Sequence, residues 1–481
     1  MVRPLGSPTA SAIHRPSGST SESPRLLLGL LLGLVALRGL LWSLLVPPWQ
    51  GPDEPKHLEY VLLLRLKGRP IGLEDASPPL QRSIIASMEA FEFWWHLRRP
   101  APVPLPADFG QLWPSAPTLL MRQPLYYILS LPVAWLTSDQ PLVSQLFLLR
   151  LVSVALNVLV IYCLFRALRA LFPAEPALAL AGAGLVAFLP QPTFIASTYN
   201  SDNLATLVGS ALFWTAAVVL RHGWRGSTVG ALGLLTLTGL LTKRSLYPLL
   251  LASWLLLLVL GRWSRARLAA VLAGGGAALV LGAATAVALH RLGAGGRQPL
   301  TDWFLRSYLL DLDAASQQLS QLLRPTVFGP VLREQADYWL VQQFKSFWAS
   351  WGWVAHPLPD PWYGALAGLT AAGLASAILA LGWPGRSPLD PVQRRGILMA
   401  LGLLGANLGA AWLFYTTYSA AAFPQGRYLF PALGPFVLLL LVGIRRWSGP
   451  FRPALGAGVI VAGLLFDTAC LVGSLLPSFY F

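Results

Sequence analysis

Apolar runs close to twenty residues long divide the 481-residue chain, and they constrain its fold more than any other feature. A helix needs about 20 mostly apolar residues to cross the hydrocarbon core of a bilayer. Only 11% of the residues are charged and 55% are hydrophobic, which excludes both a soluble globular enzyme and an intrinsically disordered chain. The sequence therefore predicts an all-α polytopic membrane protein with about 11 transmembrane helices. The runs are residues 26–46, 143–165, 176–193, 203–220, 228–243, 246–261, 267–289, 362–383, 396–418, 428–444 and 453–476.

The basic residues concentrate between particular apolar runs. Six clusters hold 16 Lys or Arg and 3 Asp or Glu, so they carry 13 of the 15 net positive charges. Because short cytoplasmic loops of membrane proteins are enriched in Lys and Arg, we expect a multi-pass protein of the cell (inner) membrane with a cytoplasmic N-terminus, and no nucleic-acid partner. The clusters are residues 1–25, 166–175, 221–225, 262–267, 386–395 and 445–452.

The same topology leaves two long external loops, at about residues 47–142 and 290–361. Residues 123–137 in the first loop are apolar but short and interrupted by Pro132, so we expect a helix that lies at the membrane interface. Loops of this length in a compact domain are usually functional. The active site is therefore expected on the external face.

The N-terminal region and the two cysteines add further limits. The first apolar run is followed by no small-residue cleavage site and is interpreted as an uncleaved signal anchor. Residues 1–25 are expected to be a disordered cytoplasmic segment, and residues 26–481 a single transmembrane domain. Cys163 and Cys470 lie within apolar runs and predict neither a disulfide nor a metal site. The chain also lacks a P-loop and a GxGxxG motif, so ATP- or nicotinamide-driven chemistry is not expected.

A polar segment directly follows the first apolar run. Pro55 suits the first turn of a helix, which places Asp53 and Glu54 beside a helix N-terminus whose dipole favours ionised carboxylates. His57 and Tyr60 follow Asp53 at helical spacing and can share its side of the helix. A helix cap at a membrane exit is one interpretation. Two adjacent acids among prolines, followed by a histidine, exceed what a cap requires and predict a reactive carboxylate at the outer boundary.

Five further groups of polar and aromatic residues stand at the expected external ends of apolar runs. Interface belts, helix caps and snorkelling side chains are their ordinary interpretations. Cations placed outside, against the positive-inside trend, instead favour a bound anion, and a guanidinium binds phosphate through paired hydrogen bonds. The candidates are Tyr126; Asn200 and Asp202; Lys243 and Arg244; Lys345 and Trp351; and Arg427 and Tyr428.

These motifs occur in a definite order over about residues 26–445. They are Pro-Pro-x-x-x-Pro-Asp-Glu-Pro-x-His, Gln-Pro-Leu-Tyr-Tyr, Asn-Ser-Asp, Thr-Lys, Phe-Trp-x-x-Trp-Gly-Trp and Gln-Gly-Arg-Tyr-Leu-Phe-Pro. The ordered set resembles the GT-C superfamily of multi-pass glycosyltransferases. The likeness is greatest to its bacterial branch of predicted membrane proteins bearing Pro-Pro-Asp-Glu-Pro-x-His, relatives of the protein O-mannosyltransferases and the lipid A aminoarabinose transferase.

The resemblance implies that a sugar moves from a polyprenyl-phosphate donor to a glycan, lipid or protein acceptor outside the membrane. The usual base, an acidic residue of the first external loop, maps to Asp53, with Glu54 and His57 beside it. Relatives often carry a His-Pro-Pro-Leu pattern where this chain has Arg122-Gln123-Pro124-Leu125. The change removes a potential ligand, so no metal and no other cofactor is predicted. Substrate binding is expected from Tyr60, Tyr126, Asn200, Asp202, Lys345, Trp351 and Tyr428.

One carboxylate is chemically sufficient for this reaction. A sugar phosphodiester leaves as a phosphate monoester that needs no general acid, whereas glycoside hydrolysis uses two carboxylates. What remains is one base for the acceptor hydroxyl and cations for the leaving phosphate. Asp53 fits the base, and the expected phosphate clamp is Lys243, Arg244 and Arg427. We expect Asp53, Lys243 and Arg427 to converge, and in-line displacement to invert the anomeric centre.

A flippase for lipid-linked sugars or a polysaccharide transporter is the alternative, and an inactive scaffold is a third. Transporters often place charged residues near the membrane midplane. Arg38, Arg150 and Asp467 are ionisable residues within apolar runs, and the sequence suggests no pair among them. The acids and the histidine gather instead in an external loop, which favours chemistry over passage.

Overall fold

The structure is a computed structural model that describes residues 23–69, 71–114, 119, 123–261, 325–383, 388–417 and 424–481. The described residues are mostly helical. The first part holds α1 (Ser23–Leu45), α2 (Glu54–Lys67), η1 (Leu73–Asp75), α3 (Pro78–Ala90), α4 (Phe93–His96), α5 (Phe109–Leu112), α6 (Leu125–Leu136), α7 (Leu142–Leu171), α8 (Pro176–Ala187), α9 (Pro190–Ala196) and α10 (Asp202–His222). The second part holds α11 (Gly226–Leu240), η2 (Arg244–Leu246), α12 (Tyr247–Leu260), α16 (Pro325–Trp348), α17 (Asp360–Gly382), α18 (Pro391–Thr417), η3 (Gly426–Ala432), α19 (Leu433–Ser448), α20 (Pro453–Cys470), η4 (Leu471–Leu475) and α21 (Leu476–Tyr480). A short antiparallel hairpin pairs β1 (Ser350–Trp351) with β2 (His356–Pro357).

Each apolar run that falls on described residues coincides with a helix or a bent pair of helices. Among the described residues, seven helices are long and apolar enough to cross a membrane, or eight spans if α8 and α9, bent by 63°, count as one. Helices α11 and α12 are apolar but shorter, and the run at 267–289 lies outside the described residues. The multi-pass helical fold agrees with the prediction, whereas the number of 11 spans stays a prediction. The apolar segment at 123–137 forms α6, and its place at the membrane interface also stays a prediction.

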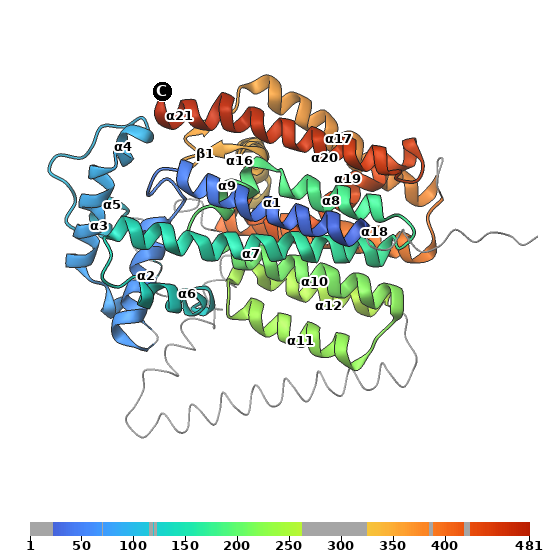
Figure 1. Ribbon diagram of the computed structural model, residues 1–481, viewed down its shortest axis with the longest axis horizontal. Helices are drawn as coiled ribbons and strands as arrows, with labels where there is room; N and C mark the ends of the chain where they lie inside the picture. Colours follow the sequence, from blue (N-terminus) through green and yellow to red (C-terminus); the bar gives the residue numbers. More distant parts are fainter. Residues whose placement is uncertain are drawn as a thin grey trace, which may run out of the picture.

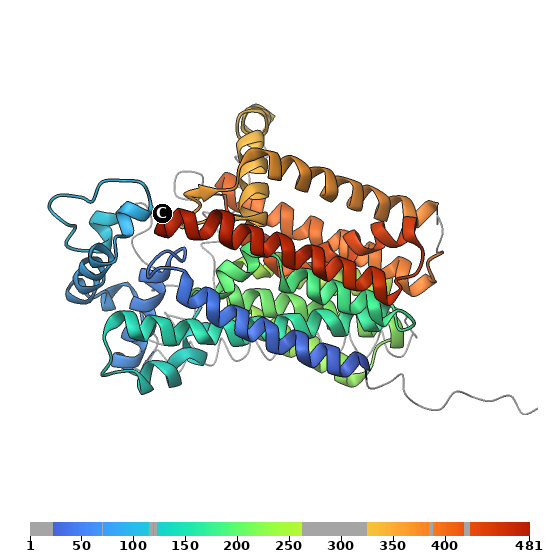
Figure 2. The same ribbon diagram turned by 45° about the horizontal axis from the view of Figure 1, so that its top comes forward.

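The long helices lie side by side along the longest axis, and helices α2 to α6 gather at one end of the bundle (Figure 1, Figure 2). We call this the α2–α6 end. One apolar core fills the bundle, and a second core lies among α2, α3, α6 and the first half of α7. The polar loop between α1 and α2 therefore lies beside two separately packed units.

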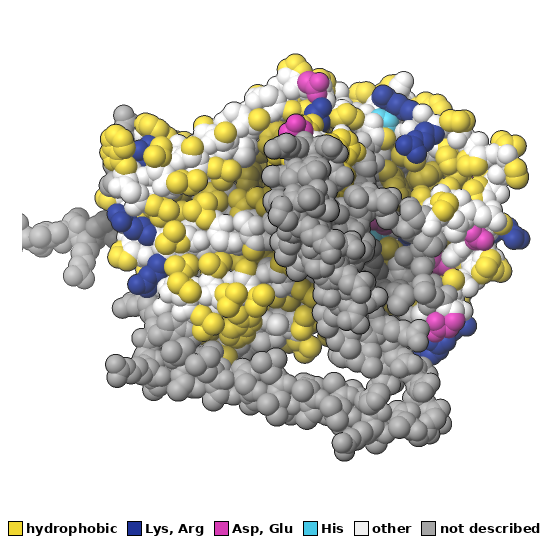
Figure 3. All heavy atoms as spheres, turned by 180° about the vertical axis from the view of Figure 1, so that it is seen from behind, with side chains coloured by type: hydrophobic (Ala, Val, Ile, Leu, Met, Phe, Trp, Pro, Cys, Tyr) yellow, Lys and Arg dark blue, Asp and Glu magenta, His cyan; other side chains and the backbone are white. Residues whose placement is uncertain are grey.

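At the opposite end, the loops are tied together by basic residues. Arg445 of α19 pairs with Glu175 before α8 at 2.8 Å, and Arg221 of α10 donates to the carbonyl of Leu171 at 2.7 Å. Figure 3 shows Lys and Arg at this end of the visible face, hydrophobic side chains along its middle, and acidic, basic and His side chains toward the α2–α6 end. The orientation of this end in the membrane stays a prediction.

A buried ion pair joins helices within the bundle. Arg38 of α1 donates through Nε to Asp467 of α20 at 2.6 Å and through Nη2 to the same carboxylate. Its Nη1 also donates to the Ala187 carbonyl at 2.8 Å and to the Thr193 hydroxyl, on the two sides of the α8–α9 bend. The expectation that these residues have no pair was therefore wrong. The partners lie 429 residues apart, so no local spacing signals the contact.

Because a buried charge without its partner is costly, Arg38→Met alone should destabilise the protein by about 3 kcal/mol. Replacing both members, as Arg38→Met with Asp467→Leu, should recover part of that loss, since no uncompensated charge remains. Unfolding of the detergent-solubilised variants, followed by Trp fluorescence, measures both effects. Equal stability of the wild type and the single variant would show that the pair does not support the fold.

Candidate functional site

The loop between α1 and α2 presents Asp53 at the α2–α6 end of the bundle. Asp53 adopts a left-handed backbone with φ 63°, and its carbonyl accepts the backbone N–H groups of Lys56 and His57, each at 3.0 Å. Its side chain turns away from the helix and accepts a hydrogen bond from Arg427 at 2.6 Å. Gly51 is required nearby, because a Cβ there would lie 2.6 Å from both Glu54 and Thr198. The backbone of Asp53 thus begins α2, while its carboxylate is directed to a different partner.

Two carboxylates and two cations form one cluster around Asp53. Arg427 of η3 reaches Asp53 through Nη2 and Asp202 of α10 through Nη1, the latter at 3.2 Å. Lys243, just before η2, pairs with the other oxygen of Asp202. The ring of Tyr428 lies 5.5 Å from the Lys243 ammonium and 5.3 Å from the Arg427 guanidinium. The structure thus brings together Asp53, Lys243 and Arg427, as expected from the sequence.

The Asp53 side chain is the accessible member of this cluster, at 26% exposed, whereas Asp202 and the Arg427 side chain are each only 3–4% exposed. Burial by itself would raise the pKa of Asp53. The positive charges of Arg427 and Lys56 outweigh burial and hold the pKa below its usual value. Asp53 is therefore ionised at neutral pH.

His57 lies one turn into α2 and is 4% exposed. Burial lowers the pKa of His57 to about 3, and the charges of Lys243 and Arg427 add to the effect while Asp53 opposes it. Its Nδ1 lies 2.7 Å from the Tyr127 hydroxyl, and the Tyr127 ring stacks on Tyr60 with centroids 3.7 Å apart. His57 is thus a neutral imidazole held by a phenol, and it adds no charge to the cluster. Tyr127 lies in the Gln-Pro-Leu-Tyr-Tyr motif, in which the sequence had indicated its neighbour Tyr126 instead.

Glu54 has a different environment from Asp53, although the two are adjacent. It is fully buried and accepts from Arg150 of α7 through both oxygens, at 2.7 and 2.8 Å. It also accepts the backbone N–H groups of Tyr199 at 2.9 Å and Gly51 at 3.2 Å. Arg150 in turn donates to carbonyls at the end of α1 and in the loop that follows, including Pro47. The expectation that Arg150 lacks a pair was wrong, and the ion pair fixes the loop that carries Asp53.

Other predicted residues support the cluster from outside it. Asn200 donates to the Pro52 carbonyl and accepts the backbone N–H of Asp202, both at 2.8 Å, so it links the Asp53 loop to α10. The Tyr126 hydroxyl lies 2.8 Å from Ser153 in the second core. Arg244 is half-buried in η2, directly after Lys243.

Two predicted residues have partners elsewhere. Lys345 pairs with Asp360 at 2.7 Å, and the buried Trp351 donates to Ser474 at 2.9 Å. Their segment still supports the cluster, because the Ser346 hydroxyl accepts the N–H of Gly426 at 2.8 Å, directly before Arg427. Within the described ranges, no three His, Cys, Asp or Glu side chains gather as metal ligands do.

The family of predicted membrane proteins DUF2142 matches residues 117–435. The chain belongs to this family. It is also similar to the crystal structure of ArnT from Cupriavidus metallidurans bound to undecaprenyl phosphate, at 13% identity and a TM-score of 0.41, over 96% of this chain and 74% of that one. The comparison with curated proteins gives no match.

A second carboxylate on α2 was not selected from the sequence as a site. Glu59 is fully buried and accepts a hydrogen bond from Gln81 of α3 at 2.5 Å, while Gln81 accepts the N–H of Phe109 at 3.0 Å. Burial raises the pKa of Glu59 to about 7, against the lowering effect of Gln81. The raised pKa signals a carboxyl that is neutral below pH 7 and holds α2, α3 and α5 together.

Glu59 should therefore make stability depend on pH. Between the ordinary pKa of 4.5 and the folded value of about 7, the unfolded chain releases the proton and the folded chain keeps it, so stability falls as pH rises. Glu59→Gln should remove this fall and be more stable than the wild type at pH 8 by on the order of 3 kcal/mol. Unfolding from pH 4 to 8 measures the effect, with the exposed Glu89→Gln as control. Parallel pH curves for Glu59→Gln and the wild type would contradict it.

Proposed function

We propose that the protein is a GT-C-type membrane glycosyltransferase that moves a sugar from a polyprenyl-phosphate donor to an acceptor at the external face. The cluster of Asp53, Asp202, Lys243 and Arg427 is the observation that carries the proposal. It combines an accessible ionised carboxylate with two cations at one end of an apolar bundle. The ordered sequence motifs that contain these residues support the same function.

Asp53 acts as the base in this proposal. Its carboxylate accepts the proton of the acceptor hydroxyl while the acceptor oxygen bonds to the anomeric carbon of the sugar. The bond from that carbon to the phosphate oxygen breaks, and its electron pair leaves with the polyprenyl phosphate. Displacement from the opposite face inverts the anomeric centre. The left-handed backbone and the Glu54–Arg150 pair hold Asp53 in place for this step.

Lys243 and Arg427 stabilise the leaving phosphate, with Arg244 beside them. The donor phosphodiester carries one negative charge and the leaving monoester gains a second, so the need for cations grows as the reaction proceeds. Without the donor, both cations are balanced by Asp53 and Asp202. When Arg427 turns to the phosphate, Asp53 loses the charge that lowers its pKa and becomes a stronger base. Donor binding thereby activates the carboxylate.

A lipid-linked donor also fits the architecture. The polyprenyl chain would bind along the apolar helices, at about 0.8 kcal/mol per buried CH₂, while the phosphate and sugar remain at the α2–α6 end. The basic opposite end would then face the cytoplasm. The sugar and the acceptor are selected by the loops around Asp53.

In the alternative function, a flippase or transporter would use buried charges to bind its substrate. Arg38 and Asp467 do form a pair, so the absence of such pairs no longer argues against transport. Arg38, however, uses its donors on three helices at once, through Asp467, the Ala187 carbonyl and Thr193. This arrangement fixes the helices rather than leaving a charge available for a substrate.

Asp53→Asn should lower sugar transfer by a factor of about 100 or more, because the variant keeps the shape of the side chain but lacks a base. Asn tolerates the left-handed backbone at this position and Arg427 keeps Asp202 as a partner, so the variant should fold with at most a modest loss of stability. The measurement is incorporation of labelled sugar in detergent, from a panel of polyprenyl-phosphate sugars, with a membrane extract as acceptor. The exposed Asp139→Asn, between α6 and α7 at the same end, is the control and should transfer at the wild-type rate.

Two results would reject this mechanism. One is unchanged transfer by purified, folded Asp53→Asn. The other is an activity that requires a sealed bilayer and forms no new glycosidic bond in detergent, which would instead support the flippase.

The pH dependence of kcat/KM gives an independent check, because it reports groups of the free enzyme. Asp53 is already ionised and His57 already neutral well below pH 5, so kcat/KM should show no acidic fall from about pH 7 to pH 5. Initial rates at low donor concentration, in wild type and in Glu59→Gln, measure it. A fall with a midpoint near 7, together with loss of transfer in Glu59→Gln, would assign the base to Glu59 instead.

A further inference from the structure

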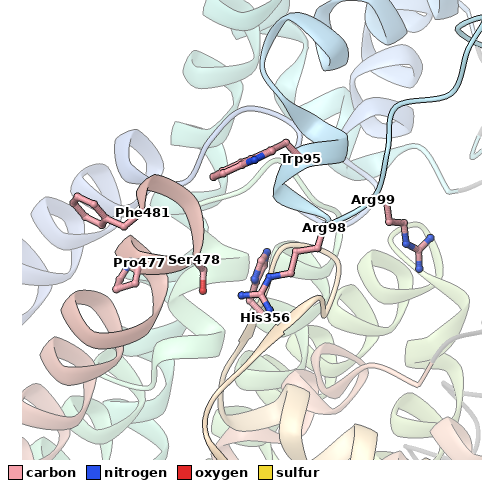
Figure 4. A pocket seen from close by; sticks show the side chains of 7 residues that line it. All are labelled: Trp95, Arg98, Arg99, His356, Pro477, Ser478 and Phe481. Carbon is pink, nitrogen blue, oxygen red and sulfur yellow. The ribbon is translucent and has the colours of Figure 1, made fainter.

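A pocket of about 360 Å³ opens at the α2–α6 end, away from the Asp53 cluster. Figure 4 shows three segments around it: the turn that contains α4, the β1–β2 hairpin and the C-terminal helix α21. The lining residues are Trp95, Arg98, Arg99, His356, Pro477, Ser478 and Phe481. The pocket thus combines two guanidinium groups and an imidazole with aromatic walls, and none of its lining side chains is acidic.

The cations of this pocket differ from those of the Asp53 cluster. Arg98 and Arg99 are exposed, and in the described part of the chain no carboxylate forms an ion pair with either. Arg427 and Lys243, by contrast, are balanced by aspartates. The pocket therefore keeps uncompensated positive charge, which favours an anionic ligand.

His356 is the buried polar group of the pocket, at 3% exposed. Its Nε2 donates to the His96 carbonyl at 2.5 Å, and its Nδ1 has no hydrogen-bond partner among the described residues. The Arg98 side chain extends toward the His356 ring (Figure 4). Burial and the charge of Arg98 lower the pKa of His356. The negative charge of a bound anion would offset the charge of Arg98 and raise the pKa of His356. Nδ1 could then take up a proton and donate a hydrogen bond to the anion.

The backbone on both sides of the pocket is strained. Glu92 and Arg98 flank α4 with φ of 55° and 57°, and Trp353 and Val354 follow β1 with φ of 56° and 66°. A β-branched residue such as Val rarely adopts this conformation. Such strain costs about 1–3 kcal/mol per residue and gathers where a precise arrangement of groups is needed for function.

The hairpin also connects the pocket to the Asp53 loop. Trp353 donates to the Trp49 carbonyl at 3.0 Å, four residues before Asp53. A Cβ at Gly352 would lie 3.0 Å from the Gln50 side chain and 3.3 Å from the His356 ring. The hairpin that lines the pocket therefore contacts the segment that leads into Asp53.

We propose that this pocket binds a phosphate group of the acceptor substrate, held by Arg98 and His356 against the ring of Trp95, with Arg99 at its rim. The assignment to the acceptor rests on the proposed function, whereas phosphate binding is argued from the pocket alone. The donor phosphate has its own cations in Lys243 and Arg427, so the second site serves a second molecule. A soluble phosphorylated glycan and a lipid head group share this chemistry, and the experiment below distinguishes them.

Titration calorimetry of the full chain in detergent tests the site, with two probes that separate these sources. Glycerol 3-phosphate represents a soluble phosphate monoester, and dihexanoyl phosphatidic acid represents a lipid head group. Arg98→Gln should weaken binding by about tenfold or more, because a charge-assisted hydrogen bond is lost. Arg82→Gln removes an exposed arginine of α3 and should leave the affinity unchanged. Lys243→Gln, which alters the donor cations, shows whether a probe occupies the donor site instead of this pocket.

Binding of both probes that depends on Arg98 supports a soluble phosphate, and binding of the lipid alone supports a head group. The site is overturned if neither probe binds at millimolar concentration, or if Arg98→Gln binds as the wild type does. It is equally overturned if Lys243→Gln alone abolishes binding, since the phosphate would then occupy the donor site.

The acceptor assignment has a separate readout. Arg98→Gln should raise the KM for the acceptor extract by about tenfold while the KM for the donor stays constant. If phosphate binding depends on Arg98 but both KM values match the wild type, the pocket binds phosphate without serving the acceptor. If Asp53→Asn transfers normally, the proposed reaction fails while the calorimetry still decides the pocket.

Discussion

Charged side chains buried at the end of an apolar bundle must neutralise one another, and this requirement shapes the candidate site. Arg427 contacts both Asp53 and Asp202, and Lys243 completes the balance. Removing any one of these charges would leave its partner uncompensated in a poorly solvated place. The cluster therefore holds separate parts of the chain together, and in the proposed mechanism the donor phosphate takes over some of its contacts.

Adjacent acids on the same loop have different tasks because their surroundings differ. Glu54 is fully buried and occupied by Arg150 and by backbone N–H groups, so it positions the loop. Asp53 is one residue away, partly exposed and bound to a cation that a phosphate can attract. The two acids are adjacent in the motif but differ in their surroundings, so Glu54 is a positioning residue in the proposed mechanism.

In the proposed reaction, two centres of positive charge at one end of the molecule bind two different phosphate groups. The first, at Lys243 and Arg427, is balanced by carboxylates and fits a phosphate whose charge increases as the reaction proceeds. The second, at Arg98, has no such balance in the described residues and fits a phosphate that only has to be held. The β1–β2 hairpin contacts the segment before Asp53 through Trp353 and lines the pocket with His356.

The sequence by itself determined the apolar helices and the polar loop that carries Asp53, because a bilayer-length run and a proline-flanked acid are local patterns. It also determined that Arg427 stands at a helix end. Only the tertiary structure decided which charges pair, as Arg38 and Asp467 show from 429 residues apart. Such pairing depends on how the helices pack. The order and spacing of helices in the sequence do not show which distant residue a side chain will contact. The pocket at Arg98 has the same origin, since three distant segments form it and none is a site alone.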